Sequence, residues 1–97
     1  MKIKLSKCIE VGSQKFRIKY TPNLKVDQDW RGCANQRTGI IEIDPCCGVG
    51  KDAVLMHELL HPIIWEYQLS ISEDDIMRLA HGLIALFDIK FDWSEIE

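Results

Sequence analysis

The sequence lacks three features that would point to particular classes of protein: a long apolar run, an excess of basic residues and a repeated unit. No apolar run approaches the length that crosses a membrane, and residues 1–7 lack the apolar core of a signal peptide. The 12 basic and 15 acidic residues give a net charge of −3, which argues against a nucleic-acid partner. We therefore expect a cytoplasmic protein that binds neither membranes nor nucleic acids.

The cysteines lack the CxxC spacing of redox and zinc motifs. They are Cys8, Cys33, Cys46 and Cys47, and adjacent cysteines such as the last two rarely bond to each other. We expect reduced and partly buried thiols, as in most cytosolic domains. A Cys8–Cys33 disulfide and a zinc site made only of cysteines stay open as alternatives.

The sequence predicts one small domain, residues 1–97, with strands in residues 1–45 and two helices in residues 52–87. Its length sets the domain count, because 97 residues suffice for one core. Short alternation of apolar and polar residues predicts strands at 2–9 and 15–20, paired as a hairpin, and the run Ile40-Ile41-Glu42-Ile43, ended by Asp44-Pro45, predicts a third strand. These strands would belong to a small antiparallel or mixed sheet.

The segments on either side of the strand at 40–43 are harder to assign. Residues 24–26 suit a short strand or a connection, and residues 30–34, which include Gly32, suit a strand with a bulge or bend. Residues 35–39 have the composition of a hairpin turn, and 46–51 that of a loop. The sheet would therefore have three to four strands.

The first helix is expected from about Asp52 to about Gln68, where apolar residues recur at helical spacing. Asp52 would cap this helix or stabilise its positive end. Pro62 conflicts with the helix, because proline removes a backbone donor and crowds the carbonyl group of Glu58. We therefore expect a kink just after His61.

The second helix is expected to run to about Phe87 from Ser72, whose side chain suits the N-cap position ahead of three acidic residues. Residues 88–97 alternate apolar side chains in part and would pack as an edge strand or a capping segment. The predicted fold class is therefore α+β, with a sheet of three to four strands followed by two helices.

The most informative stretch is the HExxH motif from His57 to His61, inside the first predicted helix. Residues four apart lie on one face of a helix, so the two histidines can bind one metal ion from the same side. Glu58 lies beside them, where it can transfer a proton. HExxH also occurs by chance, and a core helix with three polar residues on its outer side is the structural alternative.

A catalytic zinc site needs a third protein ligand, and a helical wheel at about 100° per residue favours Glu73. Glu73 shares a face with Ala80 and Ile84, and this face would pack against the first helix. An acid on a buried face needs a partner such as zinc, because burying an unpaired carboxylate is costly. The alternative role of Glu73 is to stabilise the positive end of the second helix.

His81 and Asp74 stay open as third ligands. A near-symmetric helical hairpin would place residues 79–81 opposite His61, which keeps His81 among the candidates. A histidine on the surface of the helix is the structural alternative for His81.

The motif and its surroundings resemble the small zincin-type metallopeptidases, in particular the minigluzincins and short phage and prophage proteins of that kind. The resemblance spans residues 39–87, and HExxH is its only highly specific element. It implies a minimal zincin-like domain, in the host cytoplasm if the protein is phage-encoded. Gluzincins take the third ligand from a glutamate on the following helix, which corresponds to Glu73. Pro62 and the short gap from His61 to Glu73 depart from the pattern of the family.

The function that this resemblance implies is hydrolysis of peptide bonds by Zn²⁺ held on His57, His61 and Glu73, with Glu58 as general base. A peptide or protein substrate would pair as an added strand along a sheet edge, for which 40–43 is the predicted strand. The alternative function is a catalytically silent module of phage origin that binds zinc or a partner. The sequence leaves the substrate, the oligomeric state and any latency open.

Overall fold

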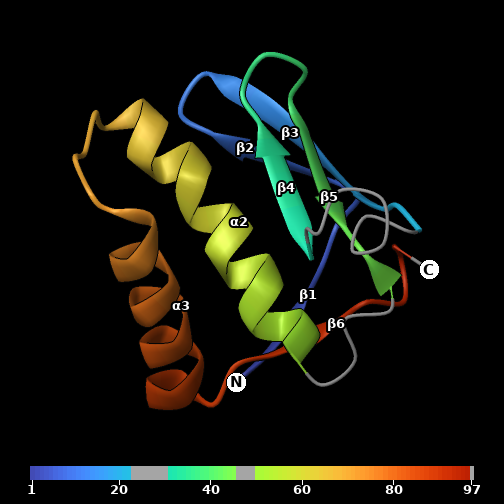
Figure 1. Cartoon of the computed structure of the whole chain (residues 1–97). Coiled ribbons are helices and arrows are strands. Elements are labelled where there is room, and N and C mark those ends of the chain that lie inside the picture. Colours follow the sequence, from blue (N-terminus) through green and yellow to red (C-terminus); the bar gives the residue numbers. More distant parts are fainter. Residues whose placement is uncertain (23–30, 46–49, 97) are drawn as a thin grey trace.

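The computed structural model describes residues 1–22, 31–45 and 50–96. It is a small domain that combines a four-stranded mixed sheet, a two-stranded sheet and two helices, so the predicted α+β class is confirmed. Helix α2 lies between the four-stranded sheet and helix α3 (Figure 1). Neither helix in the described ranges is long and apolar enough to span a membrane. The elements are β1 (Lys2–Lys4), β2 (Cys8–Val11), β3 (Gln14–Tyr20), β4 (Gly32–Asn35), β5 (Ile40–Ile43), α2 (Lys51–Glu66), α3 (Glu73–Phe87) and β6 (Lys90–Asp92).

The four-stranded sheet has the order β2-β3-β5-β4. β2 and β3 form the predicted antiparallel hairpin, β3 and β5 run parallel, and β4 and β5 run antiparallel. The strands predicted at 15–20 and 40–43 are confirmed as β3 and β5, and the predicted turn at 35–39 joins β4 to β5. In this turn the side chain of Asn35 accepts hydrogen bonds from two backbone amides. β4 is therefore an edge strand, whereas β5 has a neighbour on each side.

The prediction of one strand at 2–9 is wrong, because β1 and β2 replace it in two different sheets. Leu5 turns into the core with 4% of its surface exposed, and its amide donates to the carbonyl oxygen of Asp92. The chain therefore leaves the two-stranded sheet at Leu5 before it enters the four-stranded sheet at β2. β1 pairs in parallel with β6, so the tail at 88–97 supplies a strand as predicted.

The strand expected around 30–34 is β4; its register against β5 is continuous from Gly32 onward, so the bulge is absent there, and the chain bends at Arg31, just before the strand. Gly32 has another role, because β4 meets α2 there. A Cβ atom at this position would come within 2.9 Å of the Val54 side chain and 3.1 Å of the Glu58 side chain, so any larger residue would push these side chains away from β4. The predictions for 24–26 and for most of 46–51 fall outside the described residues.

The main core lies between the four-stranded sheet and α2. Alternation places Phe16 and Ile18 of β3 on the face toward α2, and Ile41 and Ile43 of β5 on the same face, where each is at most 2% exposed. Leu55 of α2 packs against them and is fully buried. A smaller cluster of buried residues joins α2 to α3 and consists of Leu60, Ile76 and Ala80.

Both helices are confirmed, with small differences at their ends. α2 continues through Pro62, which is buried, so the proline does not end the helix. The kink expected beside it stays a prediction. Ser72 is the N-cap of α3, as predicted, and its hydroxyl accepts from the amide of Asp75 at 3.2 Å. The N-cap of α2 is Gly50, without a side-chain hydrogen bond, so Asp52 does not cap this helix; it lies in the first turn, the position of the predicted alternative in which it stabilises the positive end.

Asp52 instead holds the tail of the chain against the start of α2. Its carboxylate accepts a hydrogen bond from Trp93 Nε1 at 2.8 Å and another from the amide of Phe91 at 3.4 Å. The ring of Trp93 stacks on that of Tyr20, with centroids 5.5 Å apart. The tail is thus both a strand and a covering segment of the core.

We expect Trp93→Phe to lower the free energy of unfolding by about 1–3 kcal/mol, because Asp52 loses a hydrogen bond to its charged carboxylate. Urea unfolding followed by circular dichroism measures the change. The control is Glu95→Gln, which removes only an exposed ion pair with Lys4 and should cost less than about 1 kcal/mol. Equal stability of Trp93→Phe and the unmodified chain would contradict this role.

Candidate metal centre

His57 and His61 lie one turn apart on the same face of α2, and their rings stack with centroids 5.3 Å apart. Glu73, the first residue of α3, reaches both of them. Its Oε2 lies 2.9 Å from His57 Nε2, and its Oε1 lies 3.3 Å from His61 Nε2. The three predicted ligands therefore come together, with one ligand atom from each within 4.8 Å of the other two.

The contact between α2 and α3 positions Glu73. Ile76 and Ala80, three and seven residues further along α3, are buried against Leu60 of α2, and residues at these spacings share a helical face. Glu73 therefore lies on the predicted face. The expectation that this face buries it is wrong, because its side chain is 68% exposed. Side chains on a helix point back toward its N-terminus, so the first residue extends beyond the packed part of the face.

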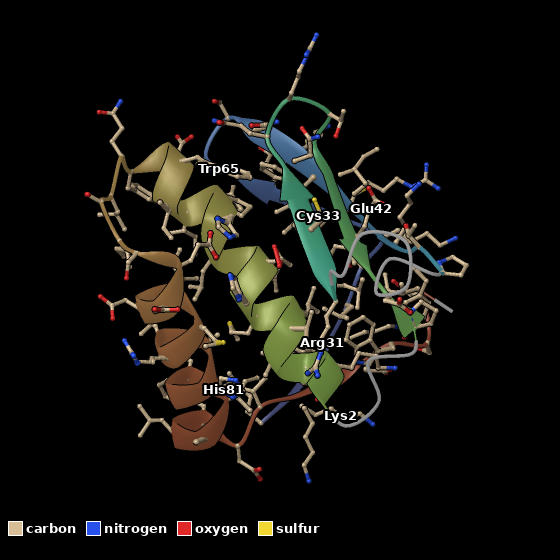
Figure 2. The ribbon with its side chains drawn as sticks, in the orientation of Figure 1. Lys2, Arg31, Cys33, Glu42, Trp65 and His81 are labelled. Carbon is tan, nitrogen blue, oxygen red and sulfur yellow. The ribbon has the colours of Figure 1, made fainter. Side chains whose placement is uncertain are left out.

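The other two candidates for the third ligand lie outside this cluster. His81 is exposed on α3 (Figure 2) and borders a hollow beside His57. Asp74 is also exposed. Among the described residues, only His57, His61 and Glu73 bring three potential ligands together, so the geometry favours Glu73.

The cluster has the types of donor atom that zinc binds. Zinc binds imidazole nitrogens and carboxylate oxygens at tetrahedral positions, and ligand atoms in such a site lie about 3.3 Å apart. Oε2 of Glu73 lies 2.9 Å from His57 Nε2 and its Oε1 lies 3.3 Å from His61 Nε2, so each histidine meets a different carboxylate oxygen. One ligand atom from each of the three residues lies within 4.8 Å of the others, and the three side chains would draw closer together to hold the ion.

Glu58 lies beside the cluster and is buried, with 8% of its surface exposed. Its Oε1 is 3.9 Å from His61 Nε2. Burial raises the pKa of Glu58 to about 7; His57 opposes this shift, and Glu73 adds to it. A carboxyl group with such a pKa can accept a proton and donate one near neutral pH.

His61 is the more buried partner of a stacked pair of rings. Burial lowers the pKa of His61. Repulsion from His57 lowers this pKa further, and attraction to Glu73 raises it in part. The neutral imidazole, which is the form that binds metals, is therefore favoured. Trp65 stacks on His61 with centroids 5.6 Å apart. The site predicted from the sequence does not include Trp65. Its position four residues after His61 indicates that the two residues share a helical face.

The two described cysteines are free thiols at opposite edges of the four-stranded sheet. Cys8 lies on β2 and Cys33 on β4, so the alternative of a disulfide between them is wrong. Burial raises the pKa of the Cys33 thiol, and the carboxylates of Glu58 and Glu42 raise it further. Cys33 is therefore a protonated thiol at neutral pH. Cys46 and Cys47 fall outside the described residues.

Comparisons of the chain with protein-family models, curated proteins and solved structures found no match. The resemblance to zincin-type metallopeptidases therefore stays a prediction. What the site can do is inferred from its own geometry: two imidazoles and a carboxylate converge at one point, and a buried carboxyl group lies next to them.

Proposed function

We propose that this protein is a zinc-dependent peptidase. The observation that carries the proposal is the convergence of His57, His61 and Glu73 within 4.8 Å, beside the buried carboxyl group of Glu58. These three residues would hold the ion and leave one position for water, as in catalytic rather than structural zinc sites. Bound zinc supplies a Lewis acid that activates water and polarises a peptide carbonyl group.

The proton transfers fall to Glu58. Its carboxylate takes a proton from the attacking water and delivers it to the nitrogen of the leaving amine, so the amine departs as a neutral group. The backbone of β4 shields Glu58 from water on one side, because Gly32 lies against the Glu58 side chain. Trp65 keeps the ring of His61 in place by stacking on it.

The strand that would bind the substrate is β4, and the predicted choice of 40–43 is wrong. Residues 40–43 form β5, and β3 and β4 occupy its two sides, so it has no free backbone groups for an added strand. β4 is the edge strand that packs against α2. A peptide added to β4 would lie across the metal centre.

The hydrogen bonds of β4 identify its free backbone groups. The carbonyl groups of Arg31 and Asn35 both accept bonds from the β5 side of the hairpin. Residues in an antiparallel pair turn their backbone groups inward and outward in alternation. Gly32 and Ala34 therefore present their N–H and C=O groups at the free edge, on either side of Cys33.

Zinc content and peptide cleavage of the purified protein test the proposal. We expect equimolar zinc by elemental mass spectrometry and cleavage of members of a peptide library. A chelator should abolish both, and added zinc should restore them. Zinc without cleavage would favour the catalytically silent module. A chain that holds no zinc under saturating conditions would contradict the proposal.

A further inference from the structure

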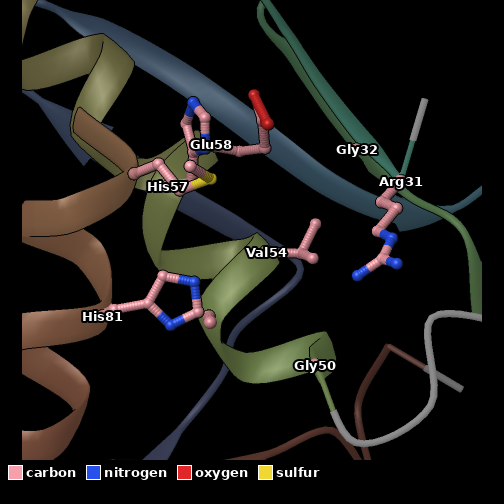
Figure 3. A pocket seen from close by; sticks show the side chains of 9 residues that line it. Arg31, Gly32, Gly50, Val54, His57, Glu58 and His81 are labelled. Carbon is pink, nitrogen blue, oxygen red and sulfur yellow. The ribbon is translucent and has the colours of Figure 1, made fainter. Parts of the chain in front are cut away.

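Two hollows lie along β4, one beside the candidate metal centre and one at the centre itself. The first, of about 300 Å³, opens between α2, α3 and the start of β4 (Figure 3). The second, of about 420 Å³, is lined by Trp65 and by the candidate ligands His57, His61 and Glu73, and we call it the Trp65 hollow. Both hollows border Gly32, His57 and Glu58, so together they form one groove that leads from the metal centre along the start of β4. We call the first hollow the Arg31 pocket; the side chains around it are those of Arg31, Val54, His57, Glu58, Met77 and His81.

The chemistry of the Arg31 pocket favours an anion. Arg31 and His81 lie on opposite sides of it, with the apolar side chain of Val54 between them (Figure 3). A guanidinium group is always charged and has five N–H donors in a planar fork, enough to bind a carboxylate as well as partners within the chain. Glu58 is the only acid among the described lining residues, and it lies next to His57, at the end toward the metal centre.

The size of the Arg31 pocket limits what can enter it. A volume of about 300 Å³ is at the lower end of the range for ligand pockets. This volume suits one side chain or one chain end better than a whole cofactor. Apolar contacts from Val54 and Met77 would accompany the aliphatic part of such a group.

The direction of β4 determines which part of a substrate reaches this pocket. Gly32 borders the Arg31 pocket, and Ala34 borders only the Trp65 hollow, so β4 runs from the first to the second. Antiparallel pairing is slightly more stable per residue than parallel pairing. A peptide paired in this way runs opposite to β4 and enters the Arg31 pocket with the residues that follow the metal centre.

We propose that the Arg31 pocket binds a substrate carboxylate on the carboxyl side of the cleaved bond. The carboxylate belongs either to an aspartate or glutamate side chain or to the free end of the peptide, and both would meet the Arg31 guanidinium. The assignment rests on the proposed peptidase function. It makes the protein an enzyme that cuts before acidic residues or near a free carboxyl end.

Peptide binding tests this assignment without requiring cleavage. The zinc-loaded Glu58→Gln variant, which leaves peptides intact, is titrated with three series of one short sequence. In the first series, each peptide has an amidated end and carries one glutamate, whose position changes from peptide to peptide. The second series replaces this glutamate with glutamine, which has no charge. In the third series, the peptide is shortened residue by residue and ends in a free carboxyl group. We expect one glutamate position, or one free end, to bind about tenfold more tightly than its neutral counterpart.

Variants of two exposed arginines then identify the group responsible. Arg31→Ala should remove the preference for the carboxylate. Arg37→Ala, which deletes an equal charge from the turn between β4 and β5, should retain it. Circular dichroism verifies that both variants are folded. Arg31→Lys should retain only part of the preference, because lysine keeps the charge and lacks the planar fork.

The outcomes separate this assignment from the proposed function. The assignment is overturned if no carboxylate improves binding, or if Arg31→Ala keeps the preference. It is also overturned if the unmodified enzyme cuts after acidic residues instead of before them. If peptides bind through Arg31 and the unmodified protein cuts none of them, the peptidase function fails while the anion pocket stands.

Discussion

Replacing Glu58 with glutamine is expected to lower the rate of peptide hydrolysis by about 10²–10⁴-fold while zinc stays bound. Glutamine has the shape of glutamate and fits the same space between α2 and β4, but its amide cannot take a proton from water. His57, His61 and Glu73 are unchanged in this variant, so the zinc content of the protein should be unchanged. Initial rates on a cleaved library peptide, together with zinc per chain, measure both quantities on one sample.

The matched control for this prediction is Glu10→Gln. It makes the same chemical change at an exposed position of β2, at the opposite edge of the sheet from β4. Its hydrolysis rate should equal that of the unmodified protein. Full activity of Glu58→Gln would show that another group transfers the proton, and the mechanism proposed for Glu58 would have to be abandoned.

Replacing Glu73 with alanine is expected to weaken zinc binding by more than about 100-fold. Loss of a residue that only supports a zinc ligand already costs about 10–100-fold in affinity, and Glu73 is placed to bind the ion directly. Competition with a coloured chelator measures the affinity. A second readout is thermal stability, since zinc at 100 times its Kd should stabilise the unmodified chain by about 2.7 kcal/mol. This gain should shrink in the variant.

His81→Ala and Asp74→Ala are the controls for Glu73→Ala, because these residues are the other candidates for the third ligand. Both side chains are exposed on α3 and outside the cluster, so their removal should leave the affinity for zinc within about threefold of the original, a difference of less than 1 kcal/mol. The opposite pattern, with a large loss in His81→Ala and none in Glu73→Ala, would move the third ligand to His81.

Local sequence patterns were sufficient for much of this fold. Alternation located β3, an isoleucine-rich run located β5, and helical spacing with a serine N-cap located α3, because these signals depend only on neighbours along the chain. The wheel that placed Glu73 on the face toward α2 worked for the same reason. It could not predict how much of the side chain is exposed, since that depends on where the packed part of the α2–α3 contact ends.

The errors come from pairings between distant segments. β1 pairs with β6 from the other end of the chain, and nothing in residues 2–9 indicates this partner. The substrate strand was assigned to 40–43 because strand order cannot be read from alternation, which is the same for a central and an edge strand. Aspartate often caps helices, but the carboxylate of Asp52 accepts a hydrogen bond from Trp93, which only the folded chain brings near.

The division of the proposed metal centre between two helices would have a thermodynamic consequence. His57 and His61 belong to α2, and Glu73 belongs to α3, which packs chiefly on α2. If α3 is docked for only a fraction of the time, the apparent affinity for zinc falls by that fraction. Bound zinc in turn increases the docked population, because the ion interacts fully only with that state. Metal occupancy and closure of the helical pair are therefore two measures of one equilibrium.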